Sequence, residues 1–437
     1  MLPNQIPPEE PTRETVEEPN YGYFPRNATI FTPPEKGYDF ASFSDSGAFQ
    51  EAVAQRYAEV YGKTGDEIGG LGRQVWHTPT ELFKPYYARA LIHAVVTDYK
   101  SNHFPLKDLV MYEVGGGNGS FMVDAVGFIR ENHPEIYERT KFRIIEISAA
   151  LAERQRAKAR EEGMIDKVEV IESDFFKWTG GDSDPCYVLA LEVFDNLAHD
   201  MVRYDLTTLQ PLQAIVSIDS TGDFSLLYEP LHDPLLSRVM SYRHQLPPTL
   251  STKPPLSPLL LSSLPLRTLY TSLPFAPNLS IPDFIPTKAV LFLESLRSRL
   301  PNHRMLVADF ARLPDAVPGR NGPVVQTRYG GSMVPCETIL VKQGYFDIFF
   351  PTDFQLLRDT YSLIMNTPSS SLSVPPKLRD EASTHSTTRE SRCGQIGIYS
   401  QTEFLERFGG GEVMKATRTR DGTSILEGMY TNANIMF

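Results

Sequence analysis

The chain has 437 residues, 41% of them hydrophobic and 22% charged, so it can bury a substantial core and exceeds one average domain. Its formal net charge of −12 argues against an extended nucleic-acid surface, because phosphate contacts need clustered Lys and Arg. Three cysteines without a C-x-x-C pair argue against a disulfide framework and a cysteine zinc site, and we expect no metal.

Residues 1–30 are rich in Pro and Glu and are predicted to be disordered. They lack the apolar stretch of a signal peptide and the basic amphipathic character of a mitochondrial presequence. No apolar run in the sequence reaches membrane-spanning length, so no membrane-spanning segment is expected.

Residues 31–105 are predicted to form a helical layer ahead of the first core strand. Apolar side chains recur at helical spacing over residues 40–61, residues 62–72 are a glycine-rich loop, and a second amphipathic run covers residues 82–98. Thr78-Pro79 before that run is typical of a helix start. The layer either covers a cofactor crevice or simply packs against a sheet.

The most informative stretch of the sequence runs from Leu109 to Ser120. An apolar run with Glu113 near its end passes into a glycine-rich turn and then into a run of helical periodicity, which predicts strand, tight turn and helix. Glycine permits the left-handed backbone of such a turn and lets a ligand approach bare backbone. The alternating glycines are Gly115, Gly117 and Gly119.

The glycine spacing separates two kinds of ligand. A dinucleotide-binding turn would place its third glycine where Ser120 stands, whereas here it comes one residue earlier, at Gly119. The pattern of Glu113 followed by the three alternate glycines resembles the turn of S-adenosylmethionine (SAM) methyltransferases.

The next two strands also end in acidic residues. Residues 142–147 form a predicted strand with Glu146 near its end, where a carboxylate can accept hydrogen bonds from two ribose hydroxyls or simply be a surface group. A third strand over residues 168–171 leads to Asp174, a candidate acceptor for an adenine amino group whose alternative role is a helix N-cap.

A fourth predicted strand, residues 186–191, is followed by a polar cluster. Ligands of open parallel sheets bind outside the carboxyl ends of the strands, near the point where the strand order reverses. Two carboxylates there could orient a guanidinium through charge-assisted hydrogen bonds, or the loop could be an acidic strand end with one Asp capping a helix. The cluster consists of Glu192, Asp195, Asn196 and His199.

The rest of the chain completes the core around two insertions. Residues 106–243 are predicted to be the cofactor-binding core, and residues 288–437 its completion, with a helix over 289–299 and a fifth strand over 304–310. Residues 244–287 contain ten prolines among leucines and serines and are predicted to be an irregular insertion or lid. Residues 366–392, rich in Ser, Thr and Pro, are a second, flexible insertion.

Together these pieces resemble one family, the MidA-like SAM-dependent methyltransferases, which include a mitochondrial protein arginine methyltransferase acting in respiratory complex I assembly. The resemblance is carried by the glycine turn, the strand ends and two elements nearer the start: Lys36-Gly37-Tyr38, Thr78-Pro79-Thr80-Glu81, Ile145-Glu146-Ile147-Ser148, Glu192-Val193-Phe194-Asp195-Asn196-Leu197 and Leu306-Val307-Ala308-Asp309-Phe310. It implies an α/β, class I (Rossmann-like) methyltransferase fold with a seven-stranded, mostly parallel sheet.

The resemblance also implies a function. It implies SAM as cofactor and methyl transfer to an arginine of a mitochondrial protein, such as a respiratory complex I subunit, with a mitochondrial location rather than the alternative, cytoplasmic one. Glu192 and Asp195 would lie by the acceptor as catalytic residues. The cofactor would be lined by Glu113, Gly115, Gly117, Gly119 and Glu146, with Asp174 near the adenine.

The sequence departs from the family at the glycine turn. Family members commonly read G-P-G-R-G-T there, whereas this chain reads Gly-Gly-Gly-Asn-Gly-Ser over residues 115–120. Three hypotheses therefore stand: an active protein arginine methyltransferase, an assembly or interaction protein that keeps the methyltransferase fold with little turnover, and a nicotinamide-dependent oxidoreductase, which the early third glycine disfavours.

Overall fold

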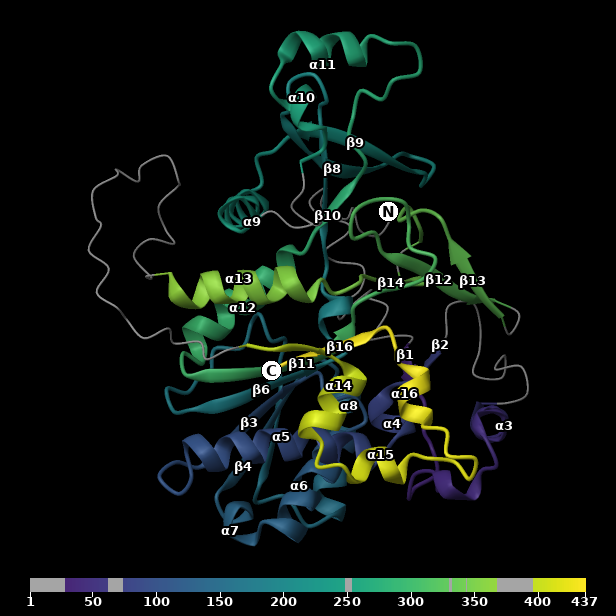
Figure 1. The fold of residues 1–437 in the computed structure, drawn as a ribbon, viewed down its shortest axis with the longest axis vertical. Coiled ribbons are helices and arrows are strands. Elements are labelled where there is room, and N and C mark those ends of the chain that lie inside the picture. The colour runs from purple at the N-terminus through teal and green to yellow at the C-terminus, as the bar shows by residue number, and fades with distance from the viewer. Residues whose placement is uncertain (1–27, 62–73, 248–253, 330–331, 343, 368–395) are drawn as a thin grey trace.

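The computed structural model describes residues 28–61, 74–247, 254–329, 332–342, 344–367 and 396–437 (Figure 1). The predicted disordered segment 1–30 lies outside these ranges except for its last three residues, which form strand β1 (Ala28–Ile30). The loop predicted over 62–72 lies outside them as well. So does the second insertion, except for its first two residues, which end or follow a helix.

A seven-stranded sheet forms the centre of the molecule, as predicted. Its strand order is β15-β16-β11-β6-β3-β4-β5, and all neighbours are parallel except β16, which runs antiparallel between β15 and β11. The strands are β3 (Leu109–Val114), β4 (Thr140–Glu146), β5 (Val168–Glu172), β6 (Cys186–Leu191), β11 (His303–Phe310), β15 (Ile398–Ser400) and β16 (Ala433–Met436). The class I methyltransferase fold is therefore confirmed.

Helices cover both faces of this sheet (Figure 1). Successive side chains of β3 alternate between two apolar cores, as expected of a strand buried on both faces: Met111 packs into one and Tyr112 into the other. The first core includes α5 (Tyr86–Asn102), α6 (Ser120–Asn132), α7 (Pro134–Tyr137), α14 (Gln401–Phe408), α15 (Glu412–Ala416) and α16 (Ile425–Met429). The second includes α9 (Pro234–Gln245), α12 (Thr287–Arg299) and α13 (Phe354–Asn366). The charged helix α8 (Ala149–Glu161) packs beside β4 and β5.

Residues 31–105 contain the predicted helices, but each predicted run is divided and its bounds differ. The run expected over residues 40–61 divides into a 3₁₀ turn (Phe40–Ser42) and α3 (Ser46–Tyr61). The run expected over residues 82–98 divides into α4 (Pro79–Leu82) and α5, because Pro85 cannot donate a helical hydrogen bond and instead caps the start of α5. Strand β1 pairs in parallel with β2 (Gln74–Trp76) ahead of α4.

The first proline-rich insertion is more regular than predicted. Residues 244–287 contain α10 (Pro258–Leu261), α11 (Leu264–Thr271) and β10 (Asp283–Ile285). The prediction failed because Pro258 and Pro265 stand in the first turns of helices, where proline is favoured, and the Ser263 hydroxyl caps α11 by accepting from the Leu266 N–H. Proline in the first turn of a helix is therefore compatible with regular structure in this insertion.

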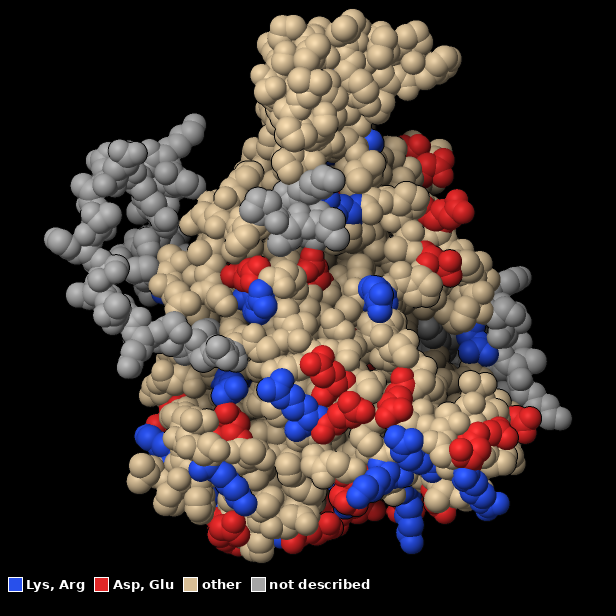
Figure 2. Space-filling model, in the orientation of Figure 1, with Lys and Arg blue, Asp and Glu red and all other residues tan. Residues whose placement is uncertain are grey.

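Two smaller antiparallel sheets lie beyond the core. Strand β10 joins β7 (Asp200–Tyr204), β8 (Pro211–Ile218) and β9 (Phe224–Pro230), and β12 (Val324–Tyr329) pairs with β13 (Ser332–Cys336) and β14 (Asp347–Phe349). Figure 2 shows the lobe of α10 and α11 as a surface without charged residues on the face viewed. Between residues 254 and 282 the single charged side chain, Arg267, is buried. Within the described residues, no helix is both long and apolar enough to cross a bilayer.

Candidate active site

The glycine turn joins β3 to α6 in a left-handed backbone. Gly115, Gly117 and Gly119 have φ values of 72°, 51° and 77°, a region that other residues adopt only at a cost. A Cβ added to Gly117 would lie 3.0 Å from the Cδ1 of Ile30 in β1. The turn therefore brings bare backbone and the unpaired N–H groups at the start of α6 to the carboxyl end of β3.

The N-terminal helical layer holds this turn from outside. Glu81 is 4% exposed, and its Oε1 accepts hydrogen bonds from Asn118 Nδ2 at 3.1 Å and from Ser120 Oγ at 2.9 Å. Lys158 of α8 donates to the same Ser120 hydroxyl at 3.1 Å. The Thr78 side chain caps α4 by accepting from the Glu81 N–H at 3.2 Å, which fixes the glutamate in place.

Two buried carboxyl groups flank the turn. Glu113, near the end of β3, is 3% exposed, and its Oε2 has no hydrogen-bond partner within the described residues. Burial, and then the charge of Glu146, raises the pKa of Glu113 to about 8. Glu146 ends β4 and accepts from the Ser148 N–H at 2.9 Å and from Gln155 Nε2 at 3.0 Å. Burial also raises the pKa of Glu146, although these hydrogen bonds oppose the rise.

Gln155 links the two parts of this crevice and was not identified from the sequence. It is fully buried on α8, and its Nε2 donates both to Glu146 and, at 2.9 Å, to the carbonyl oxygen of Gly117. A carboxylate oxygen has two lone pairs, so Glu146 keeps acceptor capacity for hydroxyl donors.

Asp174 follows β5 and starts a turn rather than a helix. Its Oδ1 accepts from the Phe176 N–H at 2.8 Å, and its Oδ2 lies 3.6 Å from the Lys177 ammonium. Asp174 is therefore not a helix N-cap in this structure. Its role toward an adenine stays a prediction.

Glu192 directly follows β6 in a strained conformation. Its φ is 54°, unusual for a residue with a Cβ, and such strain is concentrated at functional sites. The Glu192 N–H donates to the carbonyl oxygen of Ala308 at 2.9 Å, and the Asn196 side chain donates to the Glu192 carbonyl at 3.3 Å. The half-buried Glu192 side chain has no ion-pair partner within the described residues; burial, and then Asp309, raises its pKa well above the usual value.

Asp195 and Asp309 lie together beside this strand end. The Asp195 N–H donates to Asp309 Oδ2 at 3.1 Å, while Asp195 Oδ1 accepts from the Asn196 side chain at 2.7 Å. Burial raises the pKa of Asp309 to about 7, and burial with the charge of Asp309 raises that of Asp195 well above its usual value. The sequence pointed to Glu192 and Asp195; it left Asp309 unassigned, although its position at the end of the adjacent strand was a usable signal.

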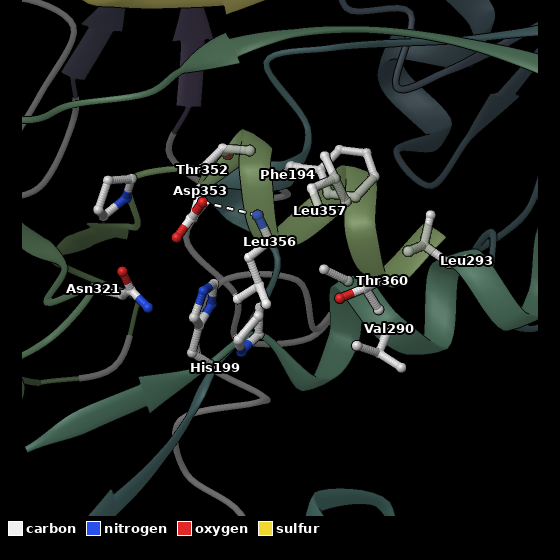
Figure 3. Close-up of a pocket in the computed structure, with 13 residues that line it drawn as sticks. Phe194, His199, Val290, Leu293, Asn321, Thr352, Asp353, Leu356, Leu357 and Thr360 are labelled. Atoms are coloured by element: carbon white, nitrogen blue, oxygen red, sulfur yellow. Dashed lines mark hydrogen bonds between the residues drawn. The ribbon is translucent and has the colours of Figure 1, made fainter. Parts of the chain in front are cut away.

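His199 belongs to a different cavity from Glu192. It helps line a pocket of about 40 Å³ between the β6–β7 loop, α12 and α13, shown in Figure 3. Its ring stacks on Phe350 with 3.8 Å between centroids, and its Nδ1 donates to the Leu197 carbonyl at 2.8 Å. Burial lowers the pKa of His199 to about 4, so the imidazole is neutral at pH 7.

These elements meet where the strand order reverses. Strand β3 has β4 on one side and β6 on the other, so the glycine turn and Glu192 both stand at the carboxyl ends of strands beside that reversal. Within the described residues, no group of three or more His, Cys, Asp or Glu is arranged to hold a metal ion. Strand order and strand-end residues together define a Rossmann-like methyltransferase.

Comparison with known proteins identifies the family. Residues 90–369, more than half of the chain, match the model of the family described as "Putative S-adenosyl-L-methionine-dependent methyltransferase", and the chain belongs to this family. A Schizosaccharomyces pombe protein, "Protein arginine methyltransferase NDUFAF7 homolog, mitochondrial", is 24% identical over 342 residues. That match covers 70% of this chain and 66% of the relative, so the chain spans just under two thirds of that protein.

Two solved structures from Burkholderia thailandensis share the fold. One, a candidate methyl transferase bound to S-adenosyl-homocysteine, is 13% identical with a TM-score of 0.57 and covers 97% of this chain and 85% of its own. The other, an uncharacterised protein of the same superfamily, is 14% identical with a TM-score of 0.51 and covers 93% of this chain and 94% of its own.

Membership of a family described as SAM-dependent methyltransferases points to SAM as the cofactor and sets the nicotinamide hypothesis aside. The residues present fit this cofactor. Glu113 has an unpartnered buried oxygen that can accept from an ammonium, Glu146 retains acceptor capacity for ribose hydroxyls, and Gly117 leaves room that a side chain would fill. When bound, SAM supplies a methyl group on a positively charged sulfur.

Proposed function

We propose that this chain is a SAM-dependent protein arginine methyltransferase in which Glu192 and Asp195 stand beside the acceptor. One observation carries the proposal: Glu192 holds a half-buried carboxyl at the strand reversal, in a strained backbone, with no cation paired to it in the described part of the chain. The arginine methyltransferase name of the Schizosaccharomyces pombe relative supports the same acceptor.

The chemistry of a guanidinium explains why a carboxylate is needed. The group stays protonated at neutral pH and carries only N–H donors, so its nitrogen becomes nucleophilic only as a proton leaves. A carboxylate at hydrogen-bond distance can orient the group and accept that proton. Holding the nitrogen in line with the methyl group supplies much of the remaining acceleration.

The raised pKa of Glu192 suits this role. A carboxyl with an ordinary pKa is a poor proton acceptor at neutral pH, and burial together with the neighbouring Asp309 makes Glu192 more basic. Binding of a cationic acceptor would favour the ionised form of the same carboxyl, so acceptor binding and activation of the base are linked.

The labelled product of the reaction tests this function. The full chain is incubated with SAM carrying a tritiated methyl group and a protein extract from cells lacking this protein, and the labelled protein is hydrolysed to amino acids. We expect labelled methylarginine, with at least about 100-fold less from Glu192→Gln. Label in another amino acid would contradict the arginine assignment. SAM binding without any transfer would favour the assembly-protein alternative.

The mitochondrial location and the complex I connection form part of the same proposal. They rest on the word mitochondrial in the relative's name and on the resemblance of the sequence to the MidA-like family. A fluorescent fusion of the protein as the cell makes it should coincide with mitochondria, and loss of the protein should reduce assembled complex I on native gels. A diffuse cytoplasmic signal with normal complex I would contradict this part.

A further inference from the structure

A small cavity lies one strand beyond the glycine turn, at the carboxyl ends of β6 and β11. Glu192 and Asp309 line it from these two strand ends, and Tyr87, Tyr430 and Gln401 line it from α5, the segment after α16, and the first turn of α14. Its volume is about 10 Å³, which is room for roughly one water molecule or one terminal amino group.

Gln401 has an unsatisfied polar atom at this cavity. The side chain is 2% exposed, Tyr87 donates its hydroxyl to Gln401 Oε1 at 3.3 Å, and Gln401 Nε2 has no hydrogen-bond partner within the described residues. Burying a polar group without a partner is unfavourable, so a hydrogen-bonding group of a ligand placed in this cavity would be stabilised by the Gln401 amide. Turning the amide over would let its nitrogen donate to the Tyr87 oxygen and place its oxygen at the cavity, because the two orientations differ only in N and O.

The charges at the cavity specify a cation. Glu192 and Asp309 both line this small space, and neither has an ion-pair partner in the described part of the chain. The Asp309 carboxyl already accepts from the N–H groups of Asp195 at 3.1 Å and Phe310 at 2.7 Å, and a second lone pair on each oxygen leaves it able to accept from a cationic N–H group. Three aromatic residues also line the cavity, namely Tyr87, Phe310 and Tyr430, and an aromatic ring attracts a cation that lies over its face. The terminal nitrogen of a guanidinium has two N–H bonds, which can donate to the Asp309 carboxyl and to the turned amide, while the other guanidinium nitrogens are left for Glu192.

The position of the cavity tells which part of an acceptor would enter. The sheet order places β6 between β3 and β11, with neighbouring strands about 4.8 Å apart, so Asp309 is farther than Glu192 from the glycine turn. Asp309 is also 1% exposed, whereas Glu192 is half-buried, so the cavity is closed at Asp309 and open toward Glu192.

We infer that this cavity receives one terminal amino group of the acceptor guanidinium, the one remote from the cofactor, with Asp309 and Gln401 as positioning residues. Glu192 then faces the other nitrogens at the open side. This inference rests on the proposed arginine acceptor and names the residues that would select it. Asp195 does not line this cavity, and its Oδ1 accepts from the Asn196 side chain at 2.7 Å.

The test measures binding of three small probes to the full chain saturated with S-adenosyl-homocysteine. The probes are the N-acetyl, N-methylamide derivatives of arginine, of its neutral isostere citrulline, and of lysine, titrated by ligand-observed NMR. The variants are Asp309→Asn and Gln401→Met, which keep size and shape. The control is Asp353→Asn, a residue that lines the His199 pocket and that Asn can replace as helix cap.

The wild type and the control should bind the arginine probe at least about tenfold more tightly than the citrulline or the lysine probe. Citrulline lacks the positive charge of the guanidinium, and lysine lacks its planar arrangement of N–H donors, so each loses charge-assisted hydrogen bonds that arginine makes. In each cavity variant the ratio of arginine to citrulline or lysine affinity should fall about tenfold, while the affinity for S-adenosyl-homocysteine stays unchanged. A misfolded protein would lose both affinities.

Three results would overturn the inference. Unchanged arginine selectivity in both cavity variants would place the guanidinium elsewhere while leaving the arginine methyltransferase proposal intact. Equal binding of citrulline, preference for lysine, or no binding of any probe to the wild type would remove the guanidinium from this cavity. The labelled amino acid in the transfer experiment decides the proposed function separately from each of these results.

Discussion

The Glu81 carboxylate accepts a hydrogen bond from the Asn118 side chain at 3.1 Å, which ties the N-terminal helical layer to the glycine turn. Asn118 stands where family members commonly carry arginine. This residue, which differs from the family pattern, therefore forms the buried hydrogen bond to Glu81. Gly116 stands where they carry proline, and a Cβ at that position would lie 2.8 Å from Ile144 Cγ2. The altered turn is thus matched to its surroundings.

Glu81→Ala should loosen the glycine turn. The substitution leaves the Asn118 and Ser120 donors without their shared acceptor, so the turn loses its fixed geometry. We expect affinity for S-adenosyl-homocysteine to fall by about tenfold, the value of one hydrogen bond to a charged group. Calorimetric titration measures it, with Glu51→Ala on the exposed face of α3 as the matched control. Equal affinities of the two variants would show that the contact is irrelevant to the cofactor.

Glu192→Gly should separate stability from activity. Replacing a residue with φ of 54° by glycine relieves strain of about 1–2 kcal/mol and removes a buried carboxyl, while it deletes the proposed base. Thermal unfolding should shift upward and methyl transfer should fall by at least about 100-fold. Asp315→Gly is the matched control, because Asp315 is an exposed acidic residue with φ of 56°.

Asp315→Gly should gain stability without losing transfer. The variant Glu192→Gln should lose methyl transfer, but it should not gain the thermal stability that comes from relieving backbone strain. A Glu192→Gly protein that is less stable than wild type, or that transfers methyl at the wild-type rate, would contradict the functional-strain interpretation.

The buried Asp309 carboxyl should make stability depend on pH. Burial raises its pKa from 3.8 to about 7, so the folded chain binds this proton more strongly than the unfolded chain does. The contribution of Asp309 to the free energy of unfolding therefore falls as pH rises from about 4 to about 7 and is constant above that window.

Asp309→Asn removes this titration, so the comparison is a difference between two proteins. The unfolding midpoint of the variant, relative to wild type, should be higher at pH 8 than at pH 5. Removing the Asp309 charge also lowers the pKa of Glu192 and of Asp195, which acts in the same direction, while groups that Asp309 does not affect, such as His199, cancel in the comparison. A difference that is the same at both pH values, or larger at pH 5, would contradict a raised pKa of the Asp309 carboxyl.

Local sequence patterns predicted the sheet and its turn because these depend on local signals. Hydrophobic strands, alternate glycines and acidic strand ends are short-range features, and Glu113, Glu146 and Glu192 all lie at the strand ends where they were expected. The helix break before α5 at Pro85, and the helices with Pro258 and Pro265 in their first turns, were missed. Proline is favoured in the first turn of a helix but interrupts the interior of one, so its presence alone does not distinguish the two cases.

The remaining site residues come from distant parts of the chain. Gln401 meets Tyr87 across more than 300 residues, and Asp309 meets Asp195 only because β11 pairs with β6. Neither contact has a local pattern, so the sequence could supply the strand-end carboxyl groups but not the side chains that tertiary packing brings to them.

The most direct test of the central claim is calorimetric titration of the full chain with SAM, with NADH as the unrelated cofactor. Gly117→Val is the test variant, because its side chain would meet Ile30 and a φ of 51° is poorly tolerated by a β-branched residue. Gly163→Val is the control, since it has φ of 64° and open space around it. We predict saturable SAM binding by wild type and control, at least about 100-fold weaker binding by Gly117→Val, and no response to NADH. Failure of the folded wild type to bind SAM, or equal binding by both variants, would contradict a cofactor site at the glycine turn.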